Sequence, residues 1–216
     1  MQHTNERKAI GLGIFWVTFV ALTLYLGAVG RVAAADDTNT AFSVGSLFEA
    51  RRFEATLATG VLFSPLWSQV NRPTINYTIT ALQLGYMLSN VKGKGLLRGN
   101  FELAGEAFGS KIFQGPGSYV AGGTLWIRYN FVPTGGRLVP YIEGGAGLTS
   151  TDIDRQYVGQ PFNFNLEFGV GARFFVARNW SINLEFRFQH LSNADTGNRN
   201  VGVNAGGPLL GVSYLF

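Results

Sequence analysis

The chain has 216 residues, no cysteine, two histidines and a net charge of +4 at pH 7. The absence of cysteine excludes disulfides and thiolate chemistry, and so few histidines disfavour a zinc site. The basic residues are scattered along the chain, which is not the pattern of a nucleic-acid-binding surface. The chain carries 18 Phe, 8 Tyr, 4 Trp and 29 Gly but only 14% charged residues, fewer charges than a soluble domain of this size usually has.

The N-terminal segment has the layout of a secretory signal. Arg7 and Lys8 precede the apolar run AIGLGIFWVTFVALTLYLGAVG, and small residues that end at Ala35 follow it. A basic start, an apolar middle and small residues at the cleavage site are typical of exported precursors. An uncleaved membrane anchor is the alternative, because the run is long enough to span a bilayer. The expected division is a cleaved signal peptide over residues 1–35, a short periplasmic tail over 36–46 and the folded domain over 47–216.

The folded domain reads as eight β-strands, because apolar and polar residues alternate in segments separated by turn residues. The predicted strands span 47–60, 74–88, 96–109, 118–131, 138–150, 162–177, 180–192 and a last segment that ends at 216. One face is apolar, as with Phe162, Phe164 and Phe168. The other carries charges of both signs, at Glu102, Glu106, Arg128, Glu143, Glu167, Arg173, Glu185 and Arg187.

This pattern predicts an all-β fold, an eight-stranded antiparallel transmembrane β-barrel of the bacterial outer membrane. Such barrels turn an apolar band toward lipid, and side chains just fill the interior of eight strands. We expect that interior to be a polar plug of salt bridges. The linkers after odd-numbered strands are expected to be the longer ones, and a change of phase between Ile79 and Leu82 suggests a β-bulge. The final Phe216 resembles the sorting signal of outer-membrane proteins.

The segment HLSNA at residues 190–194 ends the seventh predicted strand. His190 is the one histidine that remains after the signal peptide, and both His190 and Ser192 are in phase with Phe186 and Phe188 on the apolar face. Residues two apart on a strand share a face and lie about 6.6 Å apart along it. Histidine is the usual base that activates a serine hydroxyl, so the pair is a candidate catalytic dyad facing lipid. The alternative is an amphipathic residue of the membrane interface beside an ordinary serine.

The longer stretch HLSNADTGNRNVGVN resembles the signature of the outer-membrane lipid A deacylase (PagL-like) family. The family pattern is His-x-Ser-Asn-Ala, then Asn-x-Gly and an acidic residue. Upstream, PYIEGGAGL and FNFNLEFGVGARF are similar to the fifth and sixth strands of the same family. The matching signature positions are His190, Ser192, Asn193, Ala194, Asn200 and Gly202.

The resemblance implies an ester hydrolase that uses no metal or cofactor, with lipid A of lipopolysaccharide as its substrate and its active site facing the outer leaflet. Ser192 would attack the acyl ester, and His190 would act first as general base and then as acid. Asn193 and Asn200, with backbone N–H groups of the same loop, are candidates for the oxyanion hole that stabilises charge on the carbonyl oxygen. Turn formation is the alternative role of both asparagines.

One position departs from the family pattern. The family's acidic residue falls at Asn204, which can orient an imidazole but cannot offset the charge of an imidazolium. Asp195 is the nearest carboxylate in the sequence and is the alternative third member.

Other readings of the sequence remain open. The main alternative function is a non-catalytic small barrel that binds partners through its loops, and a pore is disfavoured because eight strands leave little lumen. Lys111, Arg155 and Arg199 could meet lipid A phosphates, although solvated loop charges are the favoured interpretation. The sequence leaves open whether the barrel forms a homodimer and which acyl chain is removed.

Overall fold

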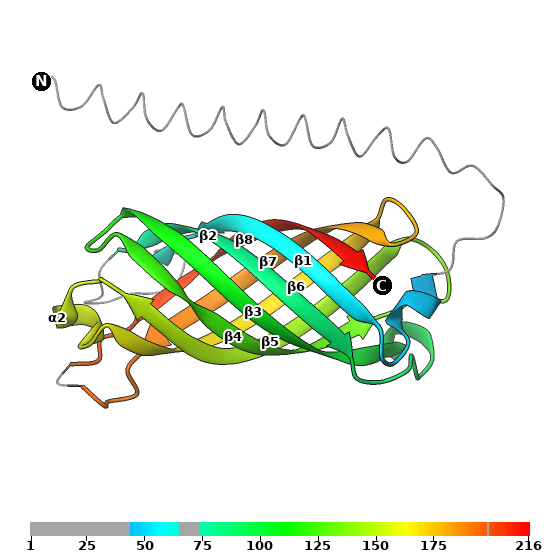
Figure 1. Ribbon diagram of the computed structural model, residues 1–216, viewed down its shortest axis with the longest axis horizontal. Helices are drawn as coiled ribbons and strands as arrows, with labels where there is room; N and C mark the ends of the chain where they lie inside the picture. The colour runs from blue at the N-terminus through cyan, green and yellow to red at the C-terminus, as the bar shows by residue number, and fades with distance from the viewer. Residues whose placement is uncertain (1–43, 65–73, 198) are drawn as a thin grey trace, which may run out of the picture. The chain divides into compact units, whose positions relative to one another are not determined.

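The computed structural model describes residues 44–64, 74–197 and 199–216. Within them, eight antiparallel strands form one closed barrel in which β1 also pairs with β8, so the predicted fold class is confirmed (Figure 1). The strands are β1 (Phe53–Leu62), β2 (Asn76–Met87), β3 (Gly99–Gln114), β4 (Tyr119–Phe131), β5 (Leu138–Thr151), β6 (Phe162–Phe175), β7 (Trp180–Ser192) and β8 (Val203–Leu215). Three short helical turns accompany them, η1 (Val44–Phe48), η3 (Gly95–Leu97) and α2 (Arg155–Val158).

The predicted signal peptide and most of the predicted tail lie outside the described residues. The first strand begins at Phe53, later than expected, because η1 occupies the preceding residues. In the described ranges, no helix has both the length and the apolar character needed to cross a bilayer.

The barrel has two ends that differ in their connections. We call the end where β1 begins and β8 finishes the termini end, and the opposite one the loop end. The loop end carries the connections after β1, β3, β5 and β7. The predicted alternation of long and short linkers is wrong at two places. The connection 88–98 is longer than 115–118, 152–161 and 193–202, and 115–118 is also shorter than 132–137. The connection 115–118 is short because β3 continues to Gln114 and forms a long hairpin with β4.

The strands turn apolar side chains outward and polar side chains inward. In β6, Phe164, Leu166 and Phe168 are about half exposed, whereas Asn165 and Glu167 between them are buried. This is inverted relative to a soluble barrel and is the arrangement that a lipid solvent favours. An outer wall of this kind makes the apolar band a surface for acyl chains, so groups placed on it meet lipid rather than water.

A buried network of arginines and glutamates fills the middle of the barrel. The Arg173 guanidinium lies 2.7 Å from Glu54 and 3.2 Å from Glu102. The Arg128 guanidinium lies 3.1 Å from Glu102 and also reaches Glu143, at 2.6 Å. A second branch forms around Arg187, which contacts Glu106, Glu167 and Glu185 at 2.8, 3.4 and 2.7 Å. The predicted salt-bridged interior is therefore present, and it ties most of the strands together.

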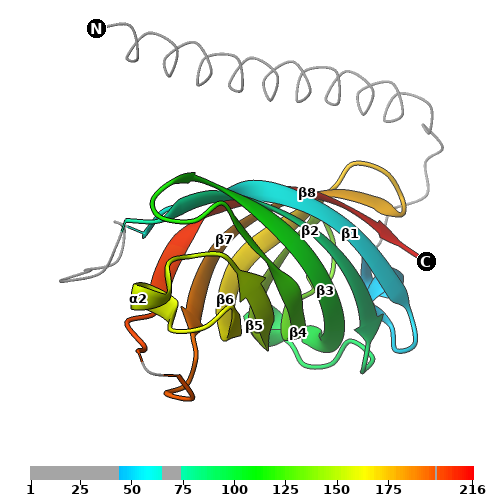
Figure 2. The same cartoon turned by 60° about the vertical axis from the view of Figure 1, so that its left-hand side comes forward.

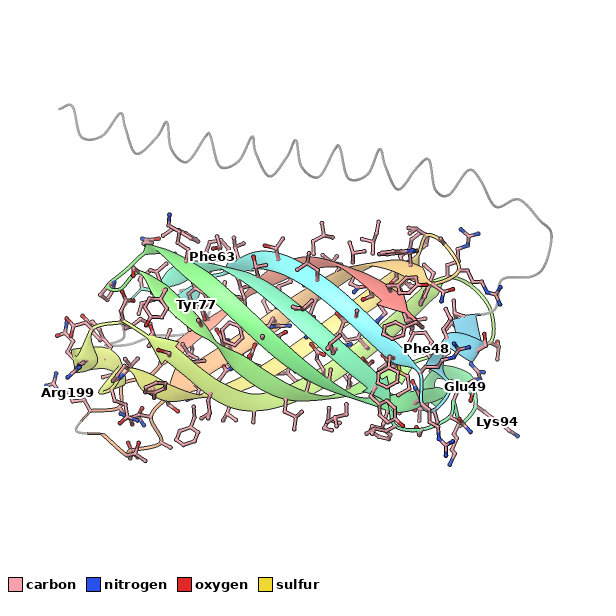
Figure 3. All side chains as sticks on the ribbon, in the orientation of Figure 1. Phe48, Glu49, Phe63, Tyr77, Lys94 and Arg199 are labelled. Carbon is pink, nitrogen blue, oxygen red and sulfur yellow. The ribbon has the colours of Figure 1, made fainter. Side chains whose placement is uncertain are left out.

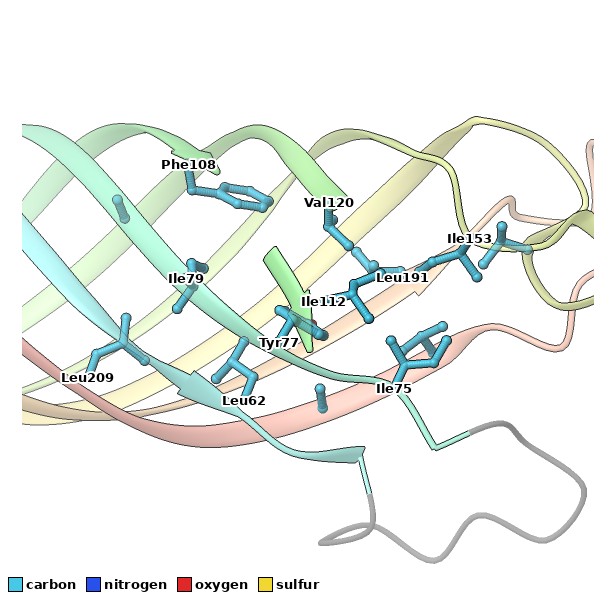
Figure 4. Close-up of a cluster of buried hydrophobic side chains, with 14 of the residues drawn as sticks. Leu62, Ile75, Tyr77, Ile79, Phe108, Ile112, Val120, Ile153, Leu191 and Leu209 are labelled. Atoms are coloured by element: carbon cyan, nitrogen blue, oxygen red, sulfur yellow. The ribbon is translucent and has the colours of Figure 1, made fainter. Parts of the chain in front are cut away.

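Apolar clusters close the interior on both sides of this network. At the termini end, Val44, Leu47 and Phe48 of η1 pack against Met87 and Phe175. At the loop end, a larger cluster contains Ile75, Tyr77, Ile79, Ile112 and Leu191 among others (Figure 4). Buried apolar side chains thus flank the ionic network on both sides along the barrel axis.

The loop-end cluster also explains an error in the sequence interpretation. No bulge lies between Ile79 and Leu82, since the β2–β3 register is regular there and shifts only between Asn76 and Tyr77. Tyr77, Ile79 and Ala81 are inward-facing apolar residues, in the same phase as the polar Gln83. The strand keeps one phase throughout. The inward-facing residues change from apolar at the loop end to polar at Gln83, and this change looks like a change of phase in the sequence.

We expect Arg173→Leu to lower the free energy of unfolding by about 3–5 kcal/mol, because it leaves the buried Glu54 without its nearest cation and removes one of the two cations that contact Glu102. The measurement is urea unfolding in detergent micelles, followed by tryptophan fluorescence. Arg178→Leu, at an exposed position in the turn between β6 and β7, is the matched control and should change stability by less than about 0.5 kcal/mol. Equal losses in the two variants would contradict a structural role for the network.

Candidate active site

The candidate dyad lies where β7 reaches the loop end. Gln189, Leu191 and Asn193 are fully buried, whereas His190 and Ser192 between them are partly exposed. Because successive side chains of a strand point to opposite faces, His190 and Ser192 lie on the outer surface of the barrel. The structure therefore places both on the same lipid-facing wall.

A hydrogen bond joins His190 to the neighbouring strand. The two residues His190 and Asn204 are directly paired across β7 and β8, and Nδ1 of His190 lies 2.5 Å from Oδ1 of Asn204. A carbonyl oxygen can only accept, so Nδ1 carries the proton and Nε2 keeps its lone pair in the neutral ring. That is the tautomer a general base needs when its reacting nitrogen is Nε2.

Ser192 lies close to the imidazole but is not hydrogen-bonded to it. A Cβ placed on Gly202 would be 3.5 Å from Cε1 of His190 and 3.8 Å from Cβ of Ser192, so the two side chains flank the same point. Gly202 has a φ of +71°, a conformation that favours glycine. Within the described residues the Ser192 hydroxyl makes no hydrogen bond. Catalytic hydrogen bonds are often long or poorly aligned in the absence of substrate and tighten when it binds.

The asparagines of the 193–202 loop hold its backbone. The Asn193 side chain is fully buried; its Nδ2 donates to the carbonyls of Val158 and Arg199 at 3.1 and 2.6 Å, and its Oδ1 accepts from the backbone N–H of Asp195. Asn200 accepts from the Asn193 N–H at 3.1 Å and donates to Asp195 at 3.0 Å. Both amides therefore support the turn, and neither is directed at Ser192 in this conformation.

The α2 turn of the neighbouring loop braces the same segment (Figure 2). The Tyr157 carbonyl accepts from the backbone N–H groups of both Val201 and Gly202, at 3.0 and 3.1 Å. Gly159 ends α2 with a φ of +72°, and a Cβ there would lie 2.1 Å from the Arg199 carbonyl oxygen. Sequence reasoning missed this brace, because no local pattern indicates which loop packs against which.

The surroundings of the dyad are apolar on one side. Phe164 and Leu166 on β6 pair with Ser192 and His190, and they are 45% and 54% exposed. Asp195 is tied to Asn200 rather than to His190, so the structure brings Asn204, and not Asp195, to the imidazole. Lys111, Arg155 and Arg199 are exposed at the loop end, and Figure 3 marks Arg199 there. No cluster of three metal-ligating side chains occurs in the part of the chain that the structure describes.

Solved structures of small outer-membrane barrels are similar to this chain. The crystal structure of the outer-membrane enzyme PagL matches with a TM-score of 0.51 and 19% identity, over 74% of this chain and 98% of that one. Neisserial surface protein A matches with a TM-score of 0.52 and 17% identity, over 76% of this chain and 96% of that one. The N-terminal barrel of OprF from Pseudomonas aeruginosa matches with a TM-score of 0.50 and 15% identity, over 77% of this chain and 98% of that one. The three structures match equally well, so these likenesses show the fold.

No curated protein matches the sequence. The sequence model of the family described as lipid A 3-O-deacylase (PagL) matches residues 60–213, which is well over half of the chain and includes His190, Ser192 and Asn204. The chain is therefore an outer-membrane β-barrel that belongs to the lipid A 3-O-deacylase (PagL) family.

Proposed function

We propose that this protein hydrolyses an ester-linked acyl chain of lipid A, with Ser192 as nucleophile and His190 as general base. The observation that carries the proposal is the hydrogen bond between His190 and Asn204 beside Ser192, on a lipid-facing wall. The family membership supplies the substrate class. A site on the outer wall suits a substrate that is itself part of the membrane, because acyl chains can reach Phe164 and Leu166 by lateral diffusion.

The reaction proceeds in two steps through an acyl-enzyme. The Ser192 hydroxyl attacks the ester carbonyl carbon while Nε2 of His190 takes its proton. The tetrahedral intermediate collapses, the bond to the sugar oxygen breaks, and His190 returns the proton to that oxygen. Water, deprotonated by His190, then attacks the acyl-serine. The bond from the acyl carbon to Oγ of Ser192 breaks, His190 returns the proton to Oγ, and the fatty acid is released. All groups required for proton transfer belong to this chain.

The oxyanion donors need a different assignment from the one expected from sequence. Because the Asn193 amide is committed to the loop, we assign Asn193 a positioning role. The backbone N–H of Ala194 is the better donor, since it makes no hydrogen bond within the described chain and lies two residues after the nucleophile. Asn200 can contribute its amide if substrate displaces the contact with Asp195.

We also propose the orientation of the barrel. Outer-membrane barrels carry short turns on the periplasmic side and longer loops outside, which puts the loop end and Ser192 at the outer leaflet. That leaflet holds the lipid A of a Gram-negative cell. A signal peptide over residues 1–35 would deliver the chain to this membrane.

Ser192→Ala should abolish deacylation, with a loss of about 10³-fold or more, because it removes the nucleophile. The measurement is mass spectrometry of lipid A from a bacterium with unmodified lipopolysaccharide that expresses each variant. Wild type should remove one acyl chain. Ser150→Ala is the matched control, since Ser150 is another partly exposed serine on the outer wall at the loop end, paired with Phe162.

The alternative outcome is equally clear. If correctly inserted wild type and Ser192→Ala barrels both leave lipid A unchanged, the proposal fails for this substrate, and a non-catalytic binding barrel becomes the better description. Two features favour that second function. The Ser192 hydroxyl is not hydrogen-bonded to His190, and Asn204 is neutral where the family has an acidic residue.

Asn204→Asp should raise the deacylation rate by about tenfold. A carboxylate would keep the same contact with Nδ1 of His190 and add a charge that stabilises the imidazolium, and a charge-assisted hydrogen bond is worth about 1 kcal/mol more than a neutral one. Asn204→Leu, which keeps the size but removes the acceptor, should lower the rate. Initial rates on purified lipid A in micelles test both. Equal rates for all three proteins would show that Asn204 does not orient His190.

Gly159→Ala should lower the deacylation rate, because its methyl group would push α2 away from the Arg199 carbonyl and loosen the loop after Ser192. Gly136→Ala is the matched control: Gly136 has a φ of +92° but has open space around its Cβ position. Gly159→Ala should also lose more thermal stability than Gly136→Ala, because it adds a steric clash to the strained φ, so activity is compared at a temperature at which both variants stay folded. Under those conditions only Gly159→Ala should lose activity. Equal deacylation rates in the two variants would exclude a positioning role for α2.

A further inference from the structure

The termini end of the barrel is strongly basic, and the proposed reaction does not involve these cationic side chains. Its described turns contain a single carboxylate, Glu49. They contain seven cations, Arg51, Arg52, Lys92, Lys94, Arg98, Arg137 and Arg178. The described loops at the other end hold Arg155 and Arg199 against Asp152, Asp154 and Asp195. The net positive charge of the described loops and turns is therefore concentrated at the termini end.

Four of these cations gather on two adjoining segments. The backbone N–H of Ala50 donates to Asn90 at 2.9 Å, and the Arg51 N–H donates to the Met87 carbonyl at 2.9 Å. These bonds hold the chain before β1 against the turn between β2 and β3. Arg51, Arg52, Lys92 and Lys94 are all exposed, and Lys94 projects from this end in Figure 3. None of the four forms an ion pair within the described ranges. We call them the basic rim.

The same turn exposes two leucines. In the sequence KGKGLLR at residues 92–98, Leu96 is 93% exposed and Leu97 is 72% exposed. The Leu97 carbonyl accepts from the Tyr129 hydroxyl at 2.7 Å, and Tyr129 belongs to the outward face of β4. The backbone of this turn is thus held beside a side chain of the outer wall, on the side of the barrel that faces the membrane, where exposed apolar side chains are favourable.

An aromatic belt sets the depth of these groups. Phe53 contacts Tyr86 and Phe216, and Trp180 contacts Tyr214, all on the outer wall at the termini end. Aromatic rings of this kind lie at the level of the lipid head groups. Arg52 directly precedes Phe53, and strand residues advance only about 3.3 Å each. Arg52 therefore lies at head-group depth, and the bonds from Ala50 and Arg51 hold the turn that carries Lys92 and Lys94 beside it.

From this arrangement we propose that the basic rim and the leucine turn, residues 92–98, form a binding surface for anionic phospholipids of the inner leaflet, such as phosphatidylglycerol. The cations bind head-group phosphates, and Leu96 and Leu97 insert among the acyl chains. A cationic segment that also carries apolar side chains is suited to an anionic membrane surface. Peptidoglycan, the other acidic partner in the periplasm, does not account for two exposed leucines in a turn whose backbone is bonded to the outward-facing Tyr129. The inner-leaflet assignment rests on the orientation proposed above, but lipid binding does not depend on catalysis.

The test is native mass spectrometry of the barrel released from micelles that contain equimolar phosphatidylglycerol and phosphatidylcholine. Wild type should retain phosphatidylglycerol with a preference of about fivefold or more, which corresponds to one engaged cation near an anionic surface. The combined variant Arg51→Gln, Arg52→Gln, Lys92→Gln and Lys94→Gln should lose the preference. The control Arg155→Gln with Arg199→Gln should keep it. Leu96→Ser with Leu97→Ser should reduce retention of both lipids at an unchanged ratio.

Several results would overturn the proposal. Equal retention of the two lipids by wild type, or loss of the preference in the loop-end control, would exclude a lipid site at the basic rim. Sedimentation of wild type, but not the rim variant, with purified peptidoglycan in the absence of a lipid preference would assign the rim to the cell wall.

Because the chain has no cysteine, Lys94→Cys can be labelled alone. Reaction with an impermeant maleimide in intact cells would exclude the inner leaflet. Ser192→Ala should show the wild-type lipid preference, so a failed hydrolase proposal would be distinguishable.

Discussion

Closure of the sheet is the constraint on which the rest of this structure depends. In hydrocarbon every backbone N–H and C=O group needs a partner within the protein, and a sheet satisfies this only when its first and last strands pair. Here β1 and β8 pair from Glu54–Leu215 to Gly60–Leu209. With eight strands the interior is filled by side chains, in this case by three arginines, their glutamates and two apolar clusters. Chemistry on a substrate therefore has no room inside and has to occur on the outer wall or in the loops.

The orienting contact of the candidate site is a consequence of the same sheet. His190 and Asn204 are neighbours because β7 and β8 pair in register, rather than because a loop happens to bring them together. A sheet that stays closed preserves this pairing when the side chain at position 204 changes. Exchange of an acid for an amide then alters the charge beside the imidazole while leaving its position and tautomer in place. Such a change adjusts the rate of a hydrolase without dismantling the site.

Alternation along the strands made most of the fold predictable. It identified eight strands, and it assigned His190 and Ser192 to the outward face, because one phase of each strand is apolar regardless of distant contacts. It was misleading at Ile79, where an apolar residue faces an apolar cluster inside the barrel. Hydrophobicity alone does not distinguish lipid from a dry interior. The roles of Asn193 and α2 were not predictable, since they depend on contacts between residues 155–159 and 193–202 that have no local signature.

Strand β7 runs from the aromatic belt beside the basic rim to the candidate site. Trp180 lies in the aromatic belt at the termini end, and Ser192 ends the same strand of 13 residues. At about 3.3 Å per residue and a tilt of about 40°, the strand advances about 30 Å along the barrel axis. That length is close to the thickness of a bilayer's hydrocarbon core, about 30 Å. Fixing one end of the barrel at a head-group layer therefore places Ser192 at the opposite boundary of the hydrocarbon, where the ester-linked chains of a lipid begin. The depth of Ser192, the proposed nucleophile, would then be determined by the length of β7 and by what holds its other end.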